Sequence, residues 1–220
     1  MRMFWALLLA AAGLVGAPGS AWSQPLDCPP MCDRIPASAW MAPSDIPLNR
    51  EYGWPGLAGL AVTTASPWFR FEEDCSLPLL PGDARSYAVA GRATVTQPQG
   101  QWQLQAQVLH WRGETWWGGQ NALSVVHAAA AALRACPLIN AQSSPSITTD
   151  EPGRLAAVIT FDGSRVLRQY LLSDTNNSTV VELAMWSAVP PAVEWQMVPD
   201  SQVFGAMAGP LCTAYVGSCR

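Results

Sequence analysis

The chain has 220 residues and a formal net charge of −4, and every basic residue is Arg because the sequence contains no Lys. No basic patch can be recognised, so nucleic acid is a poor candidate for a partner. A chain of this length suits one domain with a substantial hydrophobic core.

Residues 1–23 are predicted to be an export signal. Arg2 supplies a positive charge, and the apolar run from Phe4 to Ala17 is short for a membrane span, which needs ~20 residues. Ala21-Trp22-Ser23 fits a cleavage site. A retained membrane anchor is the alternative. We therefore expect residues 24–220 to form one secreted domain, with no stable membrane span once the signal is removed.

The segment that follows the signal is rich in Pro, Trp and Gly. A Ser-Asp cap pattern within residues 41–48 predicts one short helix, and residues 60–64 suit a short strand. Glu72, Glu73 and Asp74 are consecutive, so their carboxylates point in different directions. They lack the spaced ligand pattern of a calcium loop, and we expect a solvated acidic turn.

The stretch from Gln101 to Cys136 organises the middle of the chain. Apolar residues alternate with Gln along residues 101–108, which predicts a strand from Gln101 to Trp111 with the Gln side chains facing water. Residues 112–119 read as a turn that holds two adjacent indoles. A helix is predicted from Gln120 to Arg134, because its apolar residues recur at helical spacing.

Further strands are predicted before and after this stretch. They cover residues 86–97, 147–149 together with 155–161, 166–173 and 179–187, with Gly, Asn and Asp in the turns between them. A last helix begins at Asp200 or Ser201 and turns Val203, Phe204, Met207 and Leu211 inward. This order predicts an α+β fold, with a mostly antiparallel sheet of about five strands and helices packed on one face.

All six cysteines lie after the signal, and an even number behind an export signal predicts three disulfides. The sequence alone does not choose among the pairings. The preferred one joins Cys75 to Cys136 across about 60 residues, which would stabilise the fold by ~4 kcal/mol. Two local bridges, or two bridges that join the ends of the domain, are the alternatives for the other four: Cys28, Cys32, Cys212 and Cys219.

No sequence motif for catalysis, a cofactor or a metal is present. The chain lacks a nucleophile elbow, a zinc-peptidase helix, a phosphate-binding loop and a dinucleotide fingerprint. It also lacks Cys-x-x-Cys, and both histidines are distant in sequence from the cysteines. We therefore expect a non-enzymatic protein. One alternative remains, in which His110 and Glu114 form an acid–base pair.

Tryptophan gives the better functional clue. Nine of the eleven Trp residues follow Ser23, and Trp116 and Trp117 are adjacent beside two glycines. Both indoles cannot easily point inward, and one functional interpretation is that one of them lines a groove for an apolar or sugar ligand. The residue pattern by itself favours the structural interpretation, in which the indoles close one end of the core beneath a loop. The candidate ligand-facing residues are His110, Trp111, Trp116 and Trp117.

From Ser38 onward the chain resembles the extracytoplasmic sensor-like domain of mycobacteria. That domain forms the outer part of a receptor serine/threonine kinase and also occurs in free-standing secreted proteins and lipoproteins. The matching features are residues 41–48, Cys75, residues 87–97, residues 128–136 and the strand pair 168–173 and 179–187.

The resemblance implies an α+β domain with a cleft between sheet and helices, a disulfide from Cys75 to Cys136, and binding of an envelope ligand. It supplies no catalytic residue. The chain departs from the family's kinase member, which has a second disulfide in its late strands, because residues 137–211 contain no Cys. We see no kinase domain, so signalling is not carried over.

The sequence thus favours an exported, non-enzymatic binding protein of the bacterial cell envelope, with a small apolar or glycan ligand. An envelope-acting hydrolase that uses His110 and Glu114 is the second hypothesis. A secreted, antigen-like structural protein that binds another protein is the third.

Overall fold

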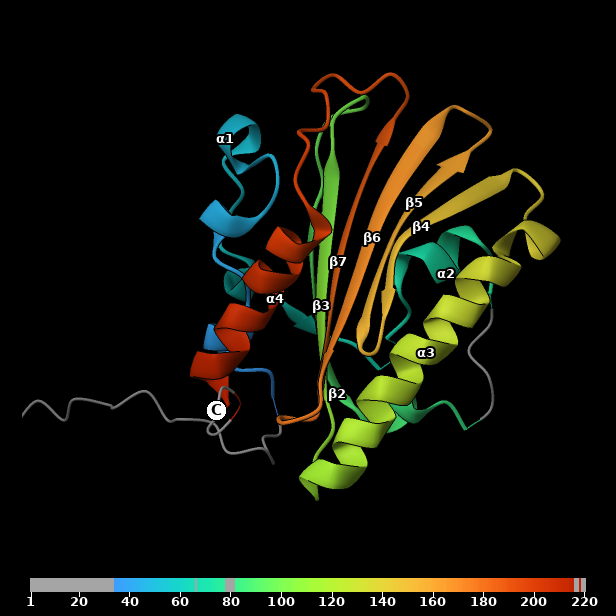
Figure 1. Ribbon diagram of the computed structural model, residues 1–220. Coiled ribbons are helices and arrows are strands. Elements are labelled where there is room, and N and C mark those ends of the chain that lie inside the picture. Colours follow the sequence, from blue (N-terminus) through green and yellow to red (C-terminus); the bar gives the residue numbers. More distant parts are fainter. Residues whose placement is uncertain (1–33, 66, 78–81, 216–217, 219–220) are drawn as a thin grey trace, which may run out of the picture.

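The computed structural model describes residues 34–65, 67–77, 82–215 and 218. Within them, a seven-stranded antiparallel sheet carries helices on both faces (Figure 1). The strands are β1 (Val62–Thr63), β2 (Val89–Val95), β3 (Gln103–His110), β4 (Ser143–Glu151), β5 (Arg154–Phe161), β6 (Arg165–Asp174) and β7 (Thr179–Ala188). The α-helices are α1 (Asn49–Tyr52), α2 (Arg70–Asp74), α3 (Thr115–Ile139) and α4 (Asp200–Ala214). Four 3-10 helices are η1 (Ala37–Ala39), η2 (Pro43–Asp45), η3 (Leu57–Gly59) and η4 (Ala84–Tyr87).

The strand order is β1-β2-β3-β7-β6-β5-β4, and every neighbouring pair is antiparallel. The α+β class and the antiparallel sheet are therefore confirmed. The predicted strand count of about five is too low, because the sheet has seven strands. The two-residue β1 lies at one edge, and at the other lies the Ser/Thr-rich β4, of which only residues 147–149 are predicted to be strand.

Two separate hydrophobic clusters cover the two faces of the sheet. On one face, α4 and the segment from η1 to η3 pack against side chains such as Leu104, Leu183 and Met185. On the other face, α2 and α3 pack against Leu109, Leu167 and Val180. The expectation of helices on one face is wrong. Because side chains alternate along a strand, β7 is buried on both faces and has few exposed positions.

The helix α3 begins at Thr115, five residues before its predicted start. Its buried residues recur at spacings of three and four, from Ala122 through Val126 and Ala129 to Leu133. Alone among the helices of the described residues, α3 is long and apolar enough to cross a membrane. Its apolar face packs on the sheet, as in a core helix of a globular domain.

The disulfide between Cys75 and Cys136 is confirmed, with their Cα atoms 5.3 Å apart. It joins the end of α2 to the last turn of α3. Cys212 is also disulfide-bonded. The export signal and Cys28, Cys32 and Cys219 lie outside the described residues, so the predictions about the signal and about the remaining pairings stay predictions.

Candidate functional site

The start of α3 lies directly on the turn between β6 and β7. A Cβ atom added at Gly118 would stand 2.3 Å from the Ser178 Oγ, and one added at Gly119 would stand 2.7 Å from the Thr175 carbonyl oxygen. Only glycine permits so close an approach. Gly118 and Gly119, which suggest a turn in the sequence, therefore lie in α3 and form the surface through which the helix contacts the β6–β7 turn.

This docking leaves the two preceding indoles in solvent. The side chains of Trp116 and Trp117 are each 64% exposed, and their rings contact each other edge to face with centroids 4.6 Å apart. Two adjacent exposed rings form a contiguous apolar surface, and contiguous apolar surfaces are the kind that mark interaction sites. We call this pair the indole platform.

The turn beneath the platform is held by its own hydrogen bonds. The Ser178 hydroxyl donates to the Thr115 carbonyl oxygen over 3.1 Å. The two carboxylate oxygens of Asp174 accept from the Asn176 backbone N–H at 2.9 Å and the Asn177 side-chain amide at 2.8 Å. The platform thus stands on a fixed base.

A groove of about 510 Å³ runs beside Trp116, between α3 and the β6–β7 turn. We call it the tryptophan groove. Its lining residues carry no formal charge: Thr115, Trp116, Gly119, Gln120, Leu123, Thr175 and Asn176.

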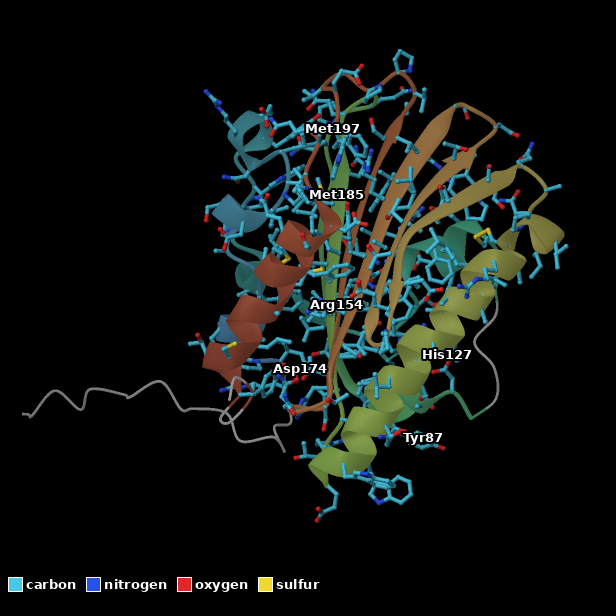
Figure 2. All side chains as sticks on the ribbon, in the orientation of Figure 1. Tyr87, His127, Arg154, Asp174, Met185 and Met197 are labelled. Carbon is cyan, nitrogen blue, oxygen red and sulfur yellow. A yellow bond between two sulfur atoms is a disulfide. The ribbon has the colours of Figure 1, made fainter. Side chains whose placement is uncertain are left out.

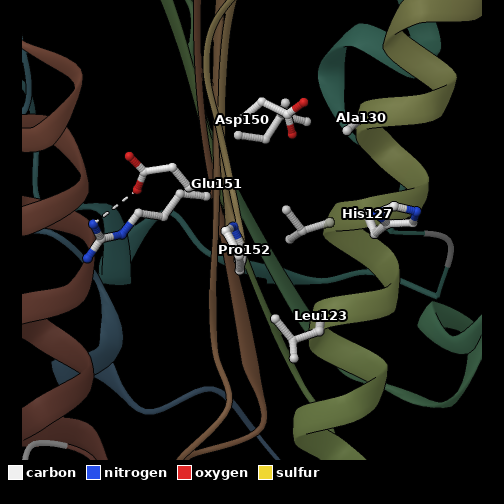
Figure 3. Close-up of a pocket in the computed structure, with 10 residues that line it drawn as sticks. Leu123, His127, Ala130, Asp150, Glu151 and Pro152 are labelled. Carbon is white, nitrogen blue, oxygen red and sulfur yellow. Dashed lines mark ion pairs between the residues drawn. The ribbon is translucent and has the colours of Figure 1, made fainter.

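A second hollow, of about 360 Å³, continues along α3 and shares Leu123 with the tryptophan groove. We call it the hairpin groove, because the β4–β5 turn forms its other wall; the lining residues are Leu123, Val126, His127, Ala130 and 150–155. Figure 3 shows Asp150 on the side that faces α3 and Glu151 on the other side of the strands. Asp150 forms an ion pair with Arg134 of α3, and Glu151 forms one with Arg154 at 3.6 Å.

A third hollow, of about 560 Å³, lies between the segment 44–51 and the start of α4. Its lining contains no aromatic side chain. It belongs to the face of the sheet opposite α3 and has no contact with the indole platform.

The other two candidate ligand-facing residues are buried. The His110 ring stacks on the Tyr215 ring with centroids 4.7 Å apart, and its Nδ1 lies 3.1 Å from the Thr179 Oγ1. The Trp111 indole donates to the Ala84 carbonyl oxygen at 2.8 Å. Both side chains support the base of the platform, and neither suits contact with a ligand. Glu114 is exposed at the start of α3, so it does not share the buried environment of His110.

A buried polar cluster is the feature that sequence reasoning missed. Gln105 and Gln107, expected to face water, are buried because the segment from Trp68 to Asp74 covers them. Glu182 of β7 lies among them and is fully buried. A charged residue in the apolar run of β7, together with the Gln row of β3, was the available signal.

Glu182 fixes the start of α2 to the sheet. One carboxylate oxygen accepts from the Arg70 backbone N–H at 2.6 Å and from the Gln169 amide at 3.0 Å. The other accepts from the Gln105 amide at 3.1 Å. Burial raises the pKa of Glu182 to about 7, although these hydrogen bonds and the nearby charge of Arg92 oppose the rise.

The three acidic residues of α2 are paired with arginines, which corrects the expectation of a solvated acidic turn. Glu72 forms a bidentate contact with Arg85, at 2.6 and 2.9 Å, in the interior. Glu73 pairs with Arg70 and Arg92, and Asp74 pairs with Arg70 and Arg165. These pairs tie α2 to η4 and to the sheet. Among the described residues, no group of three side chains suits a metal ion.

No known protein family, curated protein or solved structure matches the chain. The fold and the site define an α+β domain with a two-sided antiparallel sheet, a disulfide between α2 and α3, and an exposed indole pair beside a groove. The resemblance to the sensor-like domain therefore stays a prediction.

Proposed function

We propose that this protein is an exported, non-enzymatic binding protein of the cell envelope, and that the indole platform is its ligand-binding surface. The exposure of Trp116 and Trp117 beside the tryptophan groove carries the proposal. Aromatic side chains that supply contact area next to a concave, partly polar surface are typical of ligand sites. The resemblance to the sensor-like domain family and the Cys75–Cys136 disulfide favour an oxidising location outside the cytoplasm.

The arrangement of the platform also suits binding energetically. Gly118 and Gly119 hold the start of α3 against the β6–β7 turn, so little backbone freedom remains to be lost when a ligand binds. The hydrolase alternative receives no such support, because the imidazole of His110 is buried beneath Tyr215 and Thr179.

The test is a fluorescence titration of the purified protein with envelope lipids and glycans. We expect the emission of the wild type to shift with at least one ligand, because a bound molecule displaces water from an exposed indole. Trp116→Ala should weaken binding by about tenfold, the value of one aromatic contact of ~1.4 kcal/mol.

Met197→Ala is the matched control. Met197 is exposed, and it lies at the end of the molecule opposite the start of α3 (Figure 2). Its substitution should leave the titration unchanged. Equal affinities of Trp116→Ala and the wild type would exclude the platform as the binding surface.

A further inference from the structure

We propose that the ligand is an uncharged oligosaccharide, with one sugar ring stacked on Trp116 and the chain running along α3 through the tryptophan groove. This inference rests on the proposed function and specifies the ligand class. It is carried by the chemistry of the groove lining, by the hydrogen-bonding groups that are free there, and by the pairing of every charge in the adjoining hairpin groove.

The polar groups around Trp116 suit sugar hydroxyls. Amides and hydroxyls both donate and accept hydrogen bonds, as sugar hydroxyls do, and they come from both walls of the groove. Gln120 and Thr115 lie on α3, and Thr175 and Asn176 lie on the β6–β7 turn.

These groups are available to a ligand. Within the described part of the chain, the side chains of Thr115, Gln120 and Thr175 make no hydrogen bond, and the indole N–H of Trp116 makes none. Asn176 donates through its amide to the Ser218 carbonyl oxygen only at 3.5 Å, and its Oδ1 accepts no hydrogen bond within the same residues. An uncharged ligand with many hydroxyls can pair with all of them.

An acyl chain fits this groove poorly. Its lining combines one indole face and Leu123 with amides and hydroxyls on both walls, and a lipid chain would remove water from those polar groups without replacing their hydrogen bonds. A sugar ring has apolar C–H faces and a polar edge, so it can cover the indole and satisfy the amides together.

An anionic ligand also fits poorly. No Arg lines the tryptophan groove. At the hairpin groove, Arg154 is paired with Glu151, and Arg134 is paired with Asp150. A phosphate or carboxylate would compete with these carboxylates for the arginines.

Leu123 lines both hollows, so the hairpin groove lies next to the tryptophan groove along α3, within reach of further sugar units of a bound chain. From Trp116 to His127 the helix axis rises by ~16 Å, at ~1.5 Å per residue. This length suits several sugar units in a row. Asp150 then lies at the far end of this stretch, on the side that faces α3 (Figure 3), where its carboxylate can accept from further hydroxyls.

The experiment is a glycan array with neutral and anionic oligosaccharides, together with vesicles of phosphatidylglycerol, and it uses the secreted protein with its disulfides formed. We expect binding to neutral oligosaccharides of several units. Affinity should fall about tenfold in Trp116→Ala and about fivefold in Gln120→Ala, which loses one hydrogen-bonding amide. Met197→Ala is the control and should bind as the wild type does.

The outcomes separate the ligand class from the proposed function. If only anionic glycans or vesicles bind, and Trp116→Ala weakens that binding, the oligosaccharide is excluded while the platform remains the binding surface. If no glycan and no vesicle binds, or if Trp116→Ala binds each of them as the wild type does, both proposals fail.

Discussion

At the scale of single residues, the buried carboxyl group of Glu182 contributes to how stability depends on pH. Its pKa is raised to about 7 by burial, whereas an unfolded chain gives Glu its ordinary value of ~4.3. At pH values between these two pKa values, Glu182 keeps its proton in the folded state but has released it in the unfolded state. Linkage then requires the free energy of unfolding to fall as pH rises through this window, by ~3 kcal/mol in all.

Glu182→Gln should remove this pH dependence, because a neutral amide keeps the hydrogen bonds to Arg70 and Gln169 and cannot ionise. We expect the variant to be more stable than the wild type at pH 8, with a difference of ~3 kcal/mol or less that vanishes towards pH 4. Urea unfolding at intervals of one pH unit measures it. If the free energy of unfolding changed with pH in the same way in both proteins, Glu182 would not be the group responsible for the pH dependence.

Glu151→Gln is the matched control for this series, since Glu151 is an exposed carboxylate at the end of β4 and forms its ion pair with the equally exposed Arg154. Its substitution should leave the slope between pH 5 and pH 7 as it is in the wild type.

At the scale of elements, Gly118 determines how α3 docks on the β6–β7 turn. Gly118→Ala would place a methyl group 2.3 Å from the Ser178 Oγ and 2.4 Å from its Cβ, so the helix or the turn must move. We expect a loss of ~1–3 kcal/mol in the free energy of unfolding, although Ala favours a helix over Gly by ~1 kcal/mol.

Gly205→Ala in α4 is the matched control. A Cβ atom there would meet nothing within 4 Å, so only the helix propensity acts. The substitution should stabilise the protein by ~1 kcal/mol. Thermal or urea unfolding compares the two variants, and a Gly118→Ala protein as stable as Gly205→Ala would refute the close contact.

The disulfide between Cys75 and Cys136 connects two elements that are 61 residues apart in sequence. The double variant Cys75→Ser, Cys136→Ser should lose ~4 kcal/mol, because the unfolded chain gains the freedom of an open loop. Urea unfolding under non-reducing conditions measures the loss. A midpoint equal to that of the wild type would show that the ion pairs of α2 alone hold the element in place.

The elements also show what the sequence can reveal locally. Strands of period two and turns rich in Gly, Asn and Asp were predictable, and so was the inward face of α4, with Val203, Phe204, Met207 and Leu211 all buried. The start of α3 was not, because the helical state of Gly118 and Gly119 depends on a turn about 60 residues away. Adjacent Trp residues did predict an exposed indole at this place.

At the scale of the whole molecule, the sequence did not reveal what covers each face of the sheet. Period two in β3 correctly predicts one apolar face, yet the Gln face is covered by the segment from Trp68 to Asp74. The contacts of this segment, from Trp68 to Gln107 and from Arg70 to Glu182, are long-range. For the segment from η1 to η3 the sequence predicts a short helix within residues 41–48, but it does not reveal that the segment packs with α4 on the opposite face. Such contacts between distant segments leave little trace in local patterns.

The indole N–H resonances of the protein in nuclear magnetic resonance spectra test the central claim most directly. On addition of a neutral oligosaccharide, the Trp116 resonance, assigned by its loss in Trp116→Phe, should shift. The resonances of Trp54 and Trp102, whose indoles donate to backbone carbonyls in the interior, should stay in place. A Trp116 resonance that stays fixed while a glycan or lipid binds would contradict the account.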